Sequence, residues 1–248
     1  MKPKISIIIP VLNNLLGLQK TIISIKSQTF SNYEVWIIDG KSSKETQEYL
    51  EHLEAPFFYQ SEKDKGIYDA MNKGIAFSNG EWLYFLGAGD ELYHESVLEN
   101  CFLNRTLESV NLIAGNIVYV GNKTPFIYSK NKMTKNPSWS NDMWIRNGLH
   151  HQGTFYKKVL FLNTKYPLKY KTLSDYWLNL ILYKQNEKCF IIESTIAKCN
   201  SDGVSKSGNW NLYKEEVNLK TDLTSLLLKP IFYIVAFTKF LSRKIVND

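Results

Sequence analysis

The 248-residue sequence contains little cysteine. Its three cysteines, Cys101, Cys189 and Cys199, are too few and too widely spaced for a disulfide framework or a zinc site. A reduced, cytoplasmic environment is the simplest interpretation. Hydrophobic residues make up 44% of the chain, so extensive disorder is not expected.

Two glycine-rich phosphate-binding motifs are missing. The segment "VLNNLLGLQK" (11–20) contains neither G-x-G-x-x-G nor G-x-x-x-x-G-K-[ST], which argues against a nicotinamide dehydrogenase and a P-loop enzyme. A nucleotidyltransferase would need a glycine-rich basic loop here. Because no module of clustered basic and aromatic residues is present either, we expect no nucleic-acid partner.

A hydrophobic run long enough to span a membrane is also missing. In the most apolar stretch, residues 226–244, Lys229 and Lys239 enclose only nine residues, whereas a spanning helix needs about 20. Two interpretations stay open: a helix lying in the membrane interface, or an amphipathic helix packed on the core of its own domain.

Charge is unevenly distributed along the chain. Residues 1–112 carry a net charge of −5 and residues 113–248 a net charge of +11. The second half therefore suits an anionic partner, such as phospholipid head groups or a phosphorylated substrate. The basic residues of the C-terminal tail agree with contact at the inner face of the cytoplasmic membrane.

Short apolar runs alternate with helical patterns over the first half. This alternation predicts an α/β fold with a parallel, doubly wound sheet and right-handed crossovers. Strands are expected at 5–10, 34–40, 57–60 and 82–86, and helices at 13–28, 42–53 and 65–78. Beyond residue 110 the pattern loosens. There we expect strands at 112–120, 126–129 and 188–199, and a helix at 174–185, followed by terminal helices.

Two carboxylates follow strands of the predicted sheet. Asp39 ends the second strand, and Asp90 follows the small residues "GAG" after the strand at 82–86. Ligands of parallel sheets bind at the carboxyl ends of the strands, and a turn of small residues lets a bulky ligand approach the backbone. We therefore expect one acid to contact a base or ribose, and Asp90 to hold Mn²⁺ or Mg²⁺ bridging phosphates.

Four ordered segments carry a family resemblance. The stretches "KISIIIPVLNN", "QTFSNYEVWIIDGKSSKET", "SEKDKGIYDAMNKGIAFSNGEWLYFLGAGDEL" and "LSDYWLNL" resemble family 2 glycosyltransferases with a GT-A fold, closest to the bacterial branch that builds exopolysaccharide, capsule and O-antigen. The resemblance spans residues 4–95 and extends over 148–207. It implies a Rossmann-like, mostly parallel sheet with helices on both faces. It also implies an inverting transferase that uses a nucleotide-sugar donor, usually UDP-linked, and a divalent metal.

The resemblance divides the chain into three parts. Residues 1–110 would bind the nucleotide-sugar, residues 111–210 would form the acceptor-side catalytic half, and residues 211–248 would form a helical tail able to associate with a membrane. The acceptor would be a saccharide, carried on a membrane lipid.

The resemblance also assigns nucleotide-binding residues. Pro10 and the turn after it would line the nucleotide pocket, and Asp39 would contact the uracil or ribose. Asp64 and Lys65 would lie close to the nucleotide. Tyr68 and Met71, on the following helix, are expected to pack, whereas Asp69 and Asn72 could face the pocket.

Asp90 matches the last position of the D-x-D metal motif of the family. The earlier acid is replaced here by Ala88. One carboxylate would then hold the metal, helped by Glu91 or by water. This departure also supports an alternative, a catalytically degenerate donor-binding or scaffold subunit of a polysaccharide assembly complex.

Asp175, in "LSDYW", matches the general base of the family. Inversion requires a base that takes the proton of the acceptor hydroxyl, and a helix N-terminus favours the ionised carboxylate. The alternative is that Asp175 only caps its helix.

Two further segments complete the predicted site. In "GLHHQGTFY", His150 and His151 would point to opposite sides if the segment were a strand, leaving His151 to bind metal, acceptor or diphosphate. The segment 200–209 resembles a loop that closes over the donor, with Ser205 and Lys206 contacting phosphate. An ordinary surface loop is the alternative.

Overall fold

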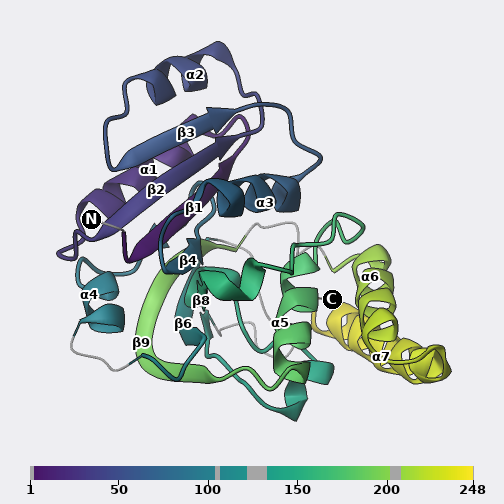
Figure 1. Ribbon diagram of the computed structural model, residues 1–248. Coiled ribbons are helices and arrows are strands. Elements are labelled where there is room, and N and C mark those ends of the chain that lie inside the picture. The colour runs from purple at the N-terminus through teal and green to yellow at the C-terminus, as the bar shows by residue number, and fades with distance from the viewer. Residues whose placement is uncertain (1–2, 104–106, 122–132, 202–207, 248) are drawn as a thin grey trace.

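The structure is a computed structural model that describes residues 3–103, 107–121, 133–201 and 208–247. Its centre is one 9-stranded sheet with the order β3-β2-β1-β4-β8-β6-β9-β5, in which β7 also pairs with β6. Figure 1 shows helices on both sides of this sheet and a pair of C-terminal helices at one end.

The first half is a parallel sheet, as the alternating pattern predicts. Neighbouring strands in the order β3-β2-β1-β4 all pair in parallel. The strands are β1 (Ile5–Val11), β2 (Tyr33–Asp39), β3 (Phe57–Ser61) and β4 (Trp82–Phe85). The helices between them are α1 (Leu15–Lys26), α2 (Lys44–Glu51) and α3 (Ile67–Phe77).

Both faces of this half are covered because β1 has no polar face. Ile5, Ile7 and Ile9 pack in one core cluster with residues of α1 and α2. Ile8, on the opposite face, packs with residues of α3. The fully buried pattern of β1 thus follows from a run that is apolar except at Ser6, whose buried hydroxyl donates to Glu34 Oε1 at 2.6 Å.

The second half of the sheet is mixed. Strand β8 (Thr154–Lys157) is inserted antiparallel between β4 and β6 (Leu112–Val120), and β9 (Cys189–Asn200) runs parallel to β6. The short strand β5 (Glu91–Leu92) pairs antiparallel with β9, and β7 (Thr134–Lys135) pairs antiparallel with β6. The short strands β5, β7 and β8 were not predicted, and the strand expected at 126–129 lies outside the described residues.

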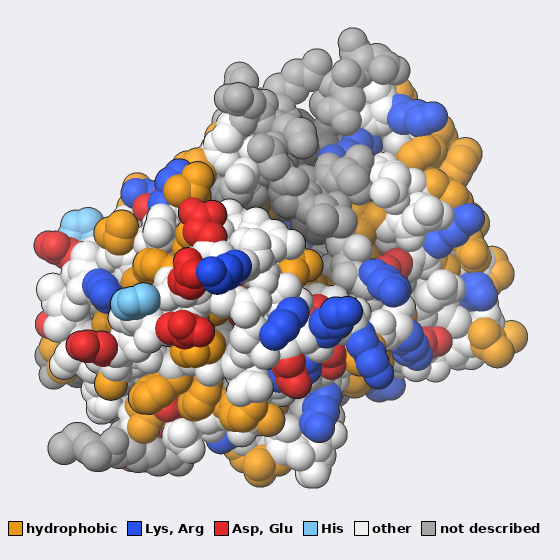
Figure 2. Space-filling view, turned by 90° about the horizontal axis from the view of Figure 1, so that it is seen from above, with side chains coloured by type: hydrophobic (Ala, Val, Ile, Leu, Met, Phe, Trp, Pro, Cys, Tyr) orange, Lys and Arg blue, Asp and Glu red, His pale blue; other side chains and the backbone are white. Residues whose placement is uncertain are grey.

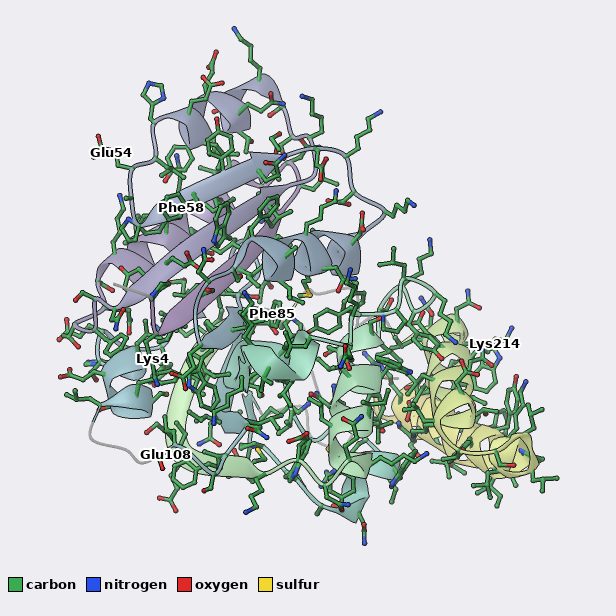
Figure 3. The ribbon with its side chains drawn as sticks, viewed as in Figure 1. Lys4, Glu54, Phe58, Phe85, Glu108 and Lys214 are labelled. Atoms are coloured by element: carbon green, nitrogen blue, oxygen red, sulfur yellow. The ribbon has the colours of Figure 1, made fainter. Side chains whose placement is uncertain are left out.

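Phe85 marks the point where the two halves meet. It ends β4 and lies near the centre of the molecule (Figure 3), with its ring edge-on to Tyr156 of β8 and to Tyr166. The remaining elements of this half are α4 (Val97–Phe102), the 3-10 helices η1 (Asn141–Trp144), η2 (His151–Gly153) and η3 (Lys158–Phe161), and α5 (Ser174–Lys184).

The chain closes with α6 (Trp210–Leu223), the 3-10 helix η5 (Leu226–Leu228) and α7 (Lys229–Asn247). Trp210, Tyr213 and Val217 of α6 pack against Phe232, Ala236 and Phe240 of α7. One face of the apolar tail is therefore buried in a small hydrophobic cluster between α6 and α7. In the described parts of the chain, no helix is both long and apolar enough to cross a bilayer.

Candidate active site

The turn after β4 is held by α1. Asn14, the N-cap of α1, accepts a bond from Gly17 N at 3.1 Å and donates to Ala88 O at 2.8 Å. Thr21 donates to Asp90 O at 2.7 Å and accepts from Gly89 N at 2.9 Å. Gly89 has a φ of 105°, which favours glycine. The small residues therefore let the chain turn tightly against α1 and present Asp90.

Asp90 is buried and hydrogen-bonded by two distant segments. Its Oδ2 accepts from Gln152 Nε2 at 2.7 Å, and its Oδ1 accepts from Asn200 N at 2.9 Å. Burial raises the pKa of the Asp90 carboxyl, and the bonds from Asn200 and Gln152 and the charge of His151 offset part of that rise. The Asp90 carboxylate is therefore fixed in position, but the protein offsets only part of the cost of burying its negative charge. Such a site favours the binding of a cation.

Gln152, whose Nε2 contacts Asp90, also carries an amide oxygen. Its Oε1 is buried and has no hydrogen-bond partner among the described residues. A carboxylate and an amide oxygen are donors that Mg²⁺ and Mn²⁺ accept, with phosphate and water completing the shell. The donor chemistry therefore fits a divalent ion. Within the described ranges, no group of three His, Cys, Asp or Glu side chains is placed to bind a metal.

Asp175 receives three side-chain donors from distant parts of the chain. Tyr68 Oη lies 3.0 Å, His151 Nδ1 3.2 Å and Asn147 Nδ2 3.4 Å from its carboxylate oxygens. Burial by itself would raise the pKa of Asp175, but the hydrogen bond and charge of His151, with the bond from Tyr68, outweigh it and lower the pKa. The carboxylate is therefore ionised at neutral pH although its side chain is only 12% exposed.

Asp175 is not the cap of its helix. Leu173 is the N-cap of α5 and makes no side-chain capping bond. The backbone N–H groups of Thr172 and Leu173 donate instead to Glu215 Oε1 of α6, at 2.8 and 2.7 Å. Besides its side-chain donors, the Asp175 carboxylate accepts a backbone hydrogen bond from Tyr176 in the first turn of α5, which also lowers its pKa.

The two histidines do not point to opposite sides. The segment forms the 3-10 helix η2 rather than a strand, so strand alternation does not apply, and the His150 and His151 rings stack 5.2 Å apart with an interplanar angle of 13°. His151 acts electrostatically on both Asp90 and Asp175. His151 contacts Asp175 directly and its neighbour Gln152 contacts Asp90, so η2 borders both acids.

Asp39 and Asp64 meet at the turn after β2. Asp39 is fully buried, and its carboxylate accepts from Ser42 N at 3.1 Å and Ser61 Oγ at 2.6 Å. A Cβ added to Gly40 would lie 2.7 Å from Asp64 Oδ2, so the Asp64 carboxylate lies directly against this turn. Asp39 thus fixes the loop, and Asp64 is the more exposed of the two acids.

The other predicted nucleotide-binding residues are less closely grouped. Pro10 is buried within β1, opposite Ile38, and the turn begins only after Val11. Lys65 is exposed, and its backbone N–H donates to Asp69 Oδ2 at 2.9 Å. Ser205 and Lys206 lie outside the described residues.

Three residues around the acids were missed or given another role. Tyr68 does pack, with its ring 5.4 Å from that of Tyr166, but its hydroxyl also contacts Asp175, so the packing interpretation was incomplete. Asn147 and Gln152 were not predicted to contact the acids. The dense polar stretch "NGLHHQ" (147–152) was the signal that could have indicated them.

Comparison with known proteins shows the family to which the chain belongs. The profile of glycosyl transferase family 2 matches residues 6–171, which is more than half of the chain. The chain belongs to glycosyl transferase family 2. A PGL/p-HBAD biosynthesis glycosyltransferase of Mycobacterium tuberculosis is 31% identical over 185 residues, covering 72% of this chain and 69% of the relative. Glycosyltransferase AglE of Haloferax volcanii is 32% identical over 123 residues, covering 47% of this chain and 40% of the relative.

Solved structures confirm the GT-A fold of this family 2 member. S. aureus TarS 1-349 in complex with UDP-GlcNAc matches with a TM-score of 0.66 at 15% identity, covering 97% of this chain and 72% of TarS. Mannosyltransferase PcManGT from Pyrobaculum calidifontis, in complex with GDP-Man and Mn²⁺, matches with a TM-score of 0.65 at 13% identity, covering 99% and 74%.

Proposed function

We propose that this family 2 glycosyltransferase is an inverting, metal-dependent enzyme. It transfers a sugar from a UDP-sugar to a saccharide acceptor carried on a lipid, in bacterial surface polysaccharide synthesis. The observation that supports this most directly is that two neighbouring side chains contact the two acids, His151 at 3.2 Å from Asp175 and Gln152 at 2.7 Å from Asp90. One acid has its pKa raised and the other has it lowered, as expected when two carboxylates have different roles.

Asp175 is the proposed general base. Its lowered pKa keeps it ionised, and its three donors fix its orientation. A fixed, ionised carboxylate can take the proton of the acceptor hydroxyl as that oxygen attacks the sugar. Tyr68, His151 and Asn147 position this base.

Asp90 and Gln152 would hold the divalent metal. When bound, such an ion supplies Lewis-acid stabilisation of the leaving diphosphate. The chain itself orients Asp90 through Asn200 N and Gln152 Nε2. Mn²⁺ and Mg²⁺ are the proposed ions, and the Mn²⁺ in the PcManGT complex supports the first of them.

Residues 1–110 are the proposed donor-binding part. The turn after β1, beyond Pro10, and the loop that Asp39 holds would border the nucleotide, with Asp64, Lys65 and His151 nearby. Ser205 and Lys206 keep their proposed role of contacting phosphate. TarS was solved with UDP-GlcNAc and PcManGT with GDP-Man. The binding experiment below therefore compares nucleotides with different nucleobases.

Residues 111–210 are the proposed acceptor side, and residues 211–248 a separate tail. A lipid-linked acceptor is favoured by the net charge of +11 over residues 113–248, because such carriers contain phosphate. We place the enzyme at the inner face of the cytoplasmic membrane for the same reason.

A scaffold subunit remains the second candidate, because Ala88 replaces one acid of the metal motif. A degenerate protein would have no need to keep three donors on a buried, ionised Asp175. We therefore favour the enzyme.

Calorimetric titration with UDP tests the proposal. It would be run with Mn²⁺ and with EDTA, on the wild type, Asp90→Ala and the control Asp142→Asn, whose carboxylate is exposed and pairs only with Arg146 among the described residues. We expect Mn²⁺-dependent binding that Asp90→Ala loses and Asp142→Asn keeps. Absence of binding to UDP, GDP and dTDP in both conditions would refute the transferase and favour the scaffold.

A further inference from the structure

One face of α7 is apolar and exposed. Along this face the exposed fractions are 55% for Ile231, 65% for Ile234, 51% for Phe237, 42% for Leu241 and 77% for Ile245. Their spacing of three and four residues places them on one side of a helix. Leu227, just before α7, is 87% exposed and lengthens the same apolar region. We call these six residues the α7 apolar face.

Most of this face lies away from the side of α7 that packs on the protein, although the Phe237 ring also lies edge-on to Trp210 of α6, 6.2 Å away. Phe232, Ala236 and Phe240 occupy the opposite side of α7 and contact α6. A helix on a soluble domain normally presents polar residues on its outer side, whereas α7 is apolar on both. Contiguous exposed apolar patches mark interaction sites rather than ordinary surface.

The charge around the α7 apolar face is positive. Residues 226–247 contain Lys229, Lys239, Arg243 and Lys244 and no acidic residue. Lys239 is paired with Glu216 at 2.6 Å. Lys244 and Lys229 lie at either end of the helix, which places cations at both ends of the apolar face.

An open recess continues this positive region. It has a volume of about 420 Å³ and is bordered by Leu226 and by the lysines 169, 214 and 229. Glu215 and Asp222 also border it, so its three lysines leave a net charge of +1. Lys169 pairs with Asp222 at 2.5 Å. Lys214 projects outward from α6 in Figure 3. On the side where α6 and α7 lie, Figure 2 shows lysine and arginine side chains interspersed with hydrophobic ones.

We propose that the α7 apolar face binds the surface of an anionic lipid bilayer, with Lys214, Lys229 and Lys244 at the level of the head groups. A helix with an apolar face flanked by basic residues lies in the plane of the interface in this way. A second copy of the chain would instead bring two basic surfaces together. The lipid surface is therefore the occupant that the charges favour. This contact does not depend on the transfer reaction.

Vesicle flotation of the full chain tests the proposal, with phosphatidylcholine vesicles that contain or lack phosphatidylglycerol. The variant is Ile231→Gln/Ile234→Gln/Leu241→Gln, which leaves Phe237 and its contact with Trp210 in place. The matched control is Leu103→Gln/Val159→Gln/Leu162→Gln, three apolar residues that are 49%, 57% and 72% exposed elsewhere. We expect binding to phosphatidylglycerol vesicles that weakens at least about tenfold in the α7 variant and is unchanged in the control.

Charge and folding are tested in the same experiment. Lys229→Gln/Lys244→Gln should weaken binding to the anionic vesicles, and raised salt should do the same to the wild type. Circular dichroism and the rate of donor hydrolysis in solution should be equal in both triple variants, because the substituted side chains are exposed. Equal vesicle binding by the α7 variant, or no vesicle binding by the wild type, would overturn the proposal. A dimer that only the α7 variant loses would assign the face to a second copy.

Discussion

Asp175→Asn tests the proposed general base while leaving the surrounding structure of the site in place. The substitution removes the charge and keeps the shape. The new amide oxygen can still accept from His151, and the new amide N–H group can donate to Tyr68 Oη, whose hydroxyl then donates to Thr172 O, 2.7 Å away. We therefore expect the variant to fold with the site intact.

Asp175→Asn should reduce the rate of transfer strongly and the stability of the protein only moderately. General-base catalysis contributes about 10²–10⁴-fold, so transfer should fall by that factor. Because the pKa of Asp175 is lowered, the fold stabilises its ionised form, and replacing it with a neutral group should cost about 1–3 kcal/mol through the lost charge-assisted hydrogen bonds. In a chain of this size that lowers Tm by about 2–12 °C.

The assay follows UDP release from a UDP-sugar with and without acceptor, beside calorimetric UDP affinity and thermal unfolding. Asp142→Asn is the control, because its exposed pair with Arg146 contributes about 0–1 kcal/mol at most. UDP affinity should be unchanged in both variants. Transfer by Asp175→Asn at more than about a tenth of the wild-type rate would refute the base assignment. Loss of UDP binding in the folded variant would refute the assignment of nucleotide binding and base catalysis to different acids.

Three further outcomes are expected. Tyr68→Phe removes a bond that lowers the pKa of Asp175, so the acid limb of the rate profile should move to higher pH; an unmoved limb would argue against Asp175 as the titrating base. Gly89→Ala introduces a side chain at a φ of 105° and should cost about 1–3 kcal/mol in urea unfolding, with weaker UDP affinity in Mn²⁺. Glu216→Gln leaves Lys220 and Lys239 without their counter-charge and should cost about 3–5 kcal/mol, whereas Glu216→Met/Lys220→Met should restore only part of that loss because Lys239 still lacks its partner.

The pH dependence of stability should reflect Glu216 as well. Burial by itself would raise its pKa, but the charges of Lys239 and Lys220 outweigh burial and lower it. A carboxyl group with a lowered pKa contributes stability above its unfolded-state value, about 4.3, and loses it as pH falls through the folded-state value. The free energy of unfolding of the wild type, measured in urea, should therefore fall as the pH is lowered through this range. That of Glu216→Met/Lys220→Met should fall less over the same range.

The parts of the fold that were predictable are those specified by local pattern. The run "ISIIIPV" is apolar at almost every position, which predicts a strand covered on both faces. The long strand β6 begins and ends where the pattern predicts. Strand β5 has two residues and β8 has four, and neither length contains a readable period. Their positions depend on pairing with β9, β4 and β6, which local sequence does not encode.

The acids of the site were predictable and most of their partners were not. Asp90 follows a buried strand and a turn of small residues, and Asp175 opens a helix, so each has a local signature. Tyr68 resembles any other aromatic residue on the buried side of an amphipathic helix. Its contact with Asp175 joins residues 107 positions apart, and only the tertiary packing of α3 near the start of α5 creates it.

The antiparallel insertion of β8 explains why Gln152 meets Asp90. Tyr84 of β4 pairs with Phe155 of β8, so the residues before β8 lie beside those that follow β4. Tyr84 Oη fixes this junction by donating to Gln152 O at 2.8 Å. Had β8 paired in parallel, its opposite end would have lain there, and Asp90 would have had no amide beside it. A strand of four residues thus decides whether Asp90, in a chain that has Ala88 in place of the other acid, has an amide side chain beside it.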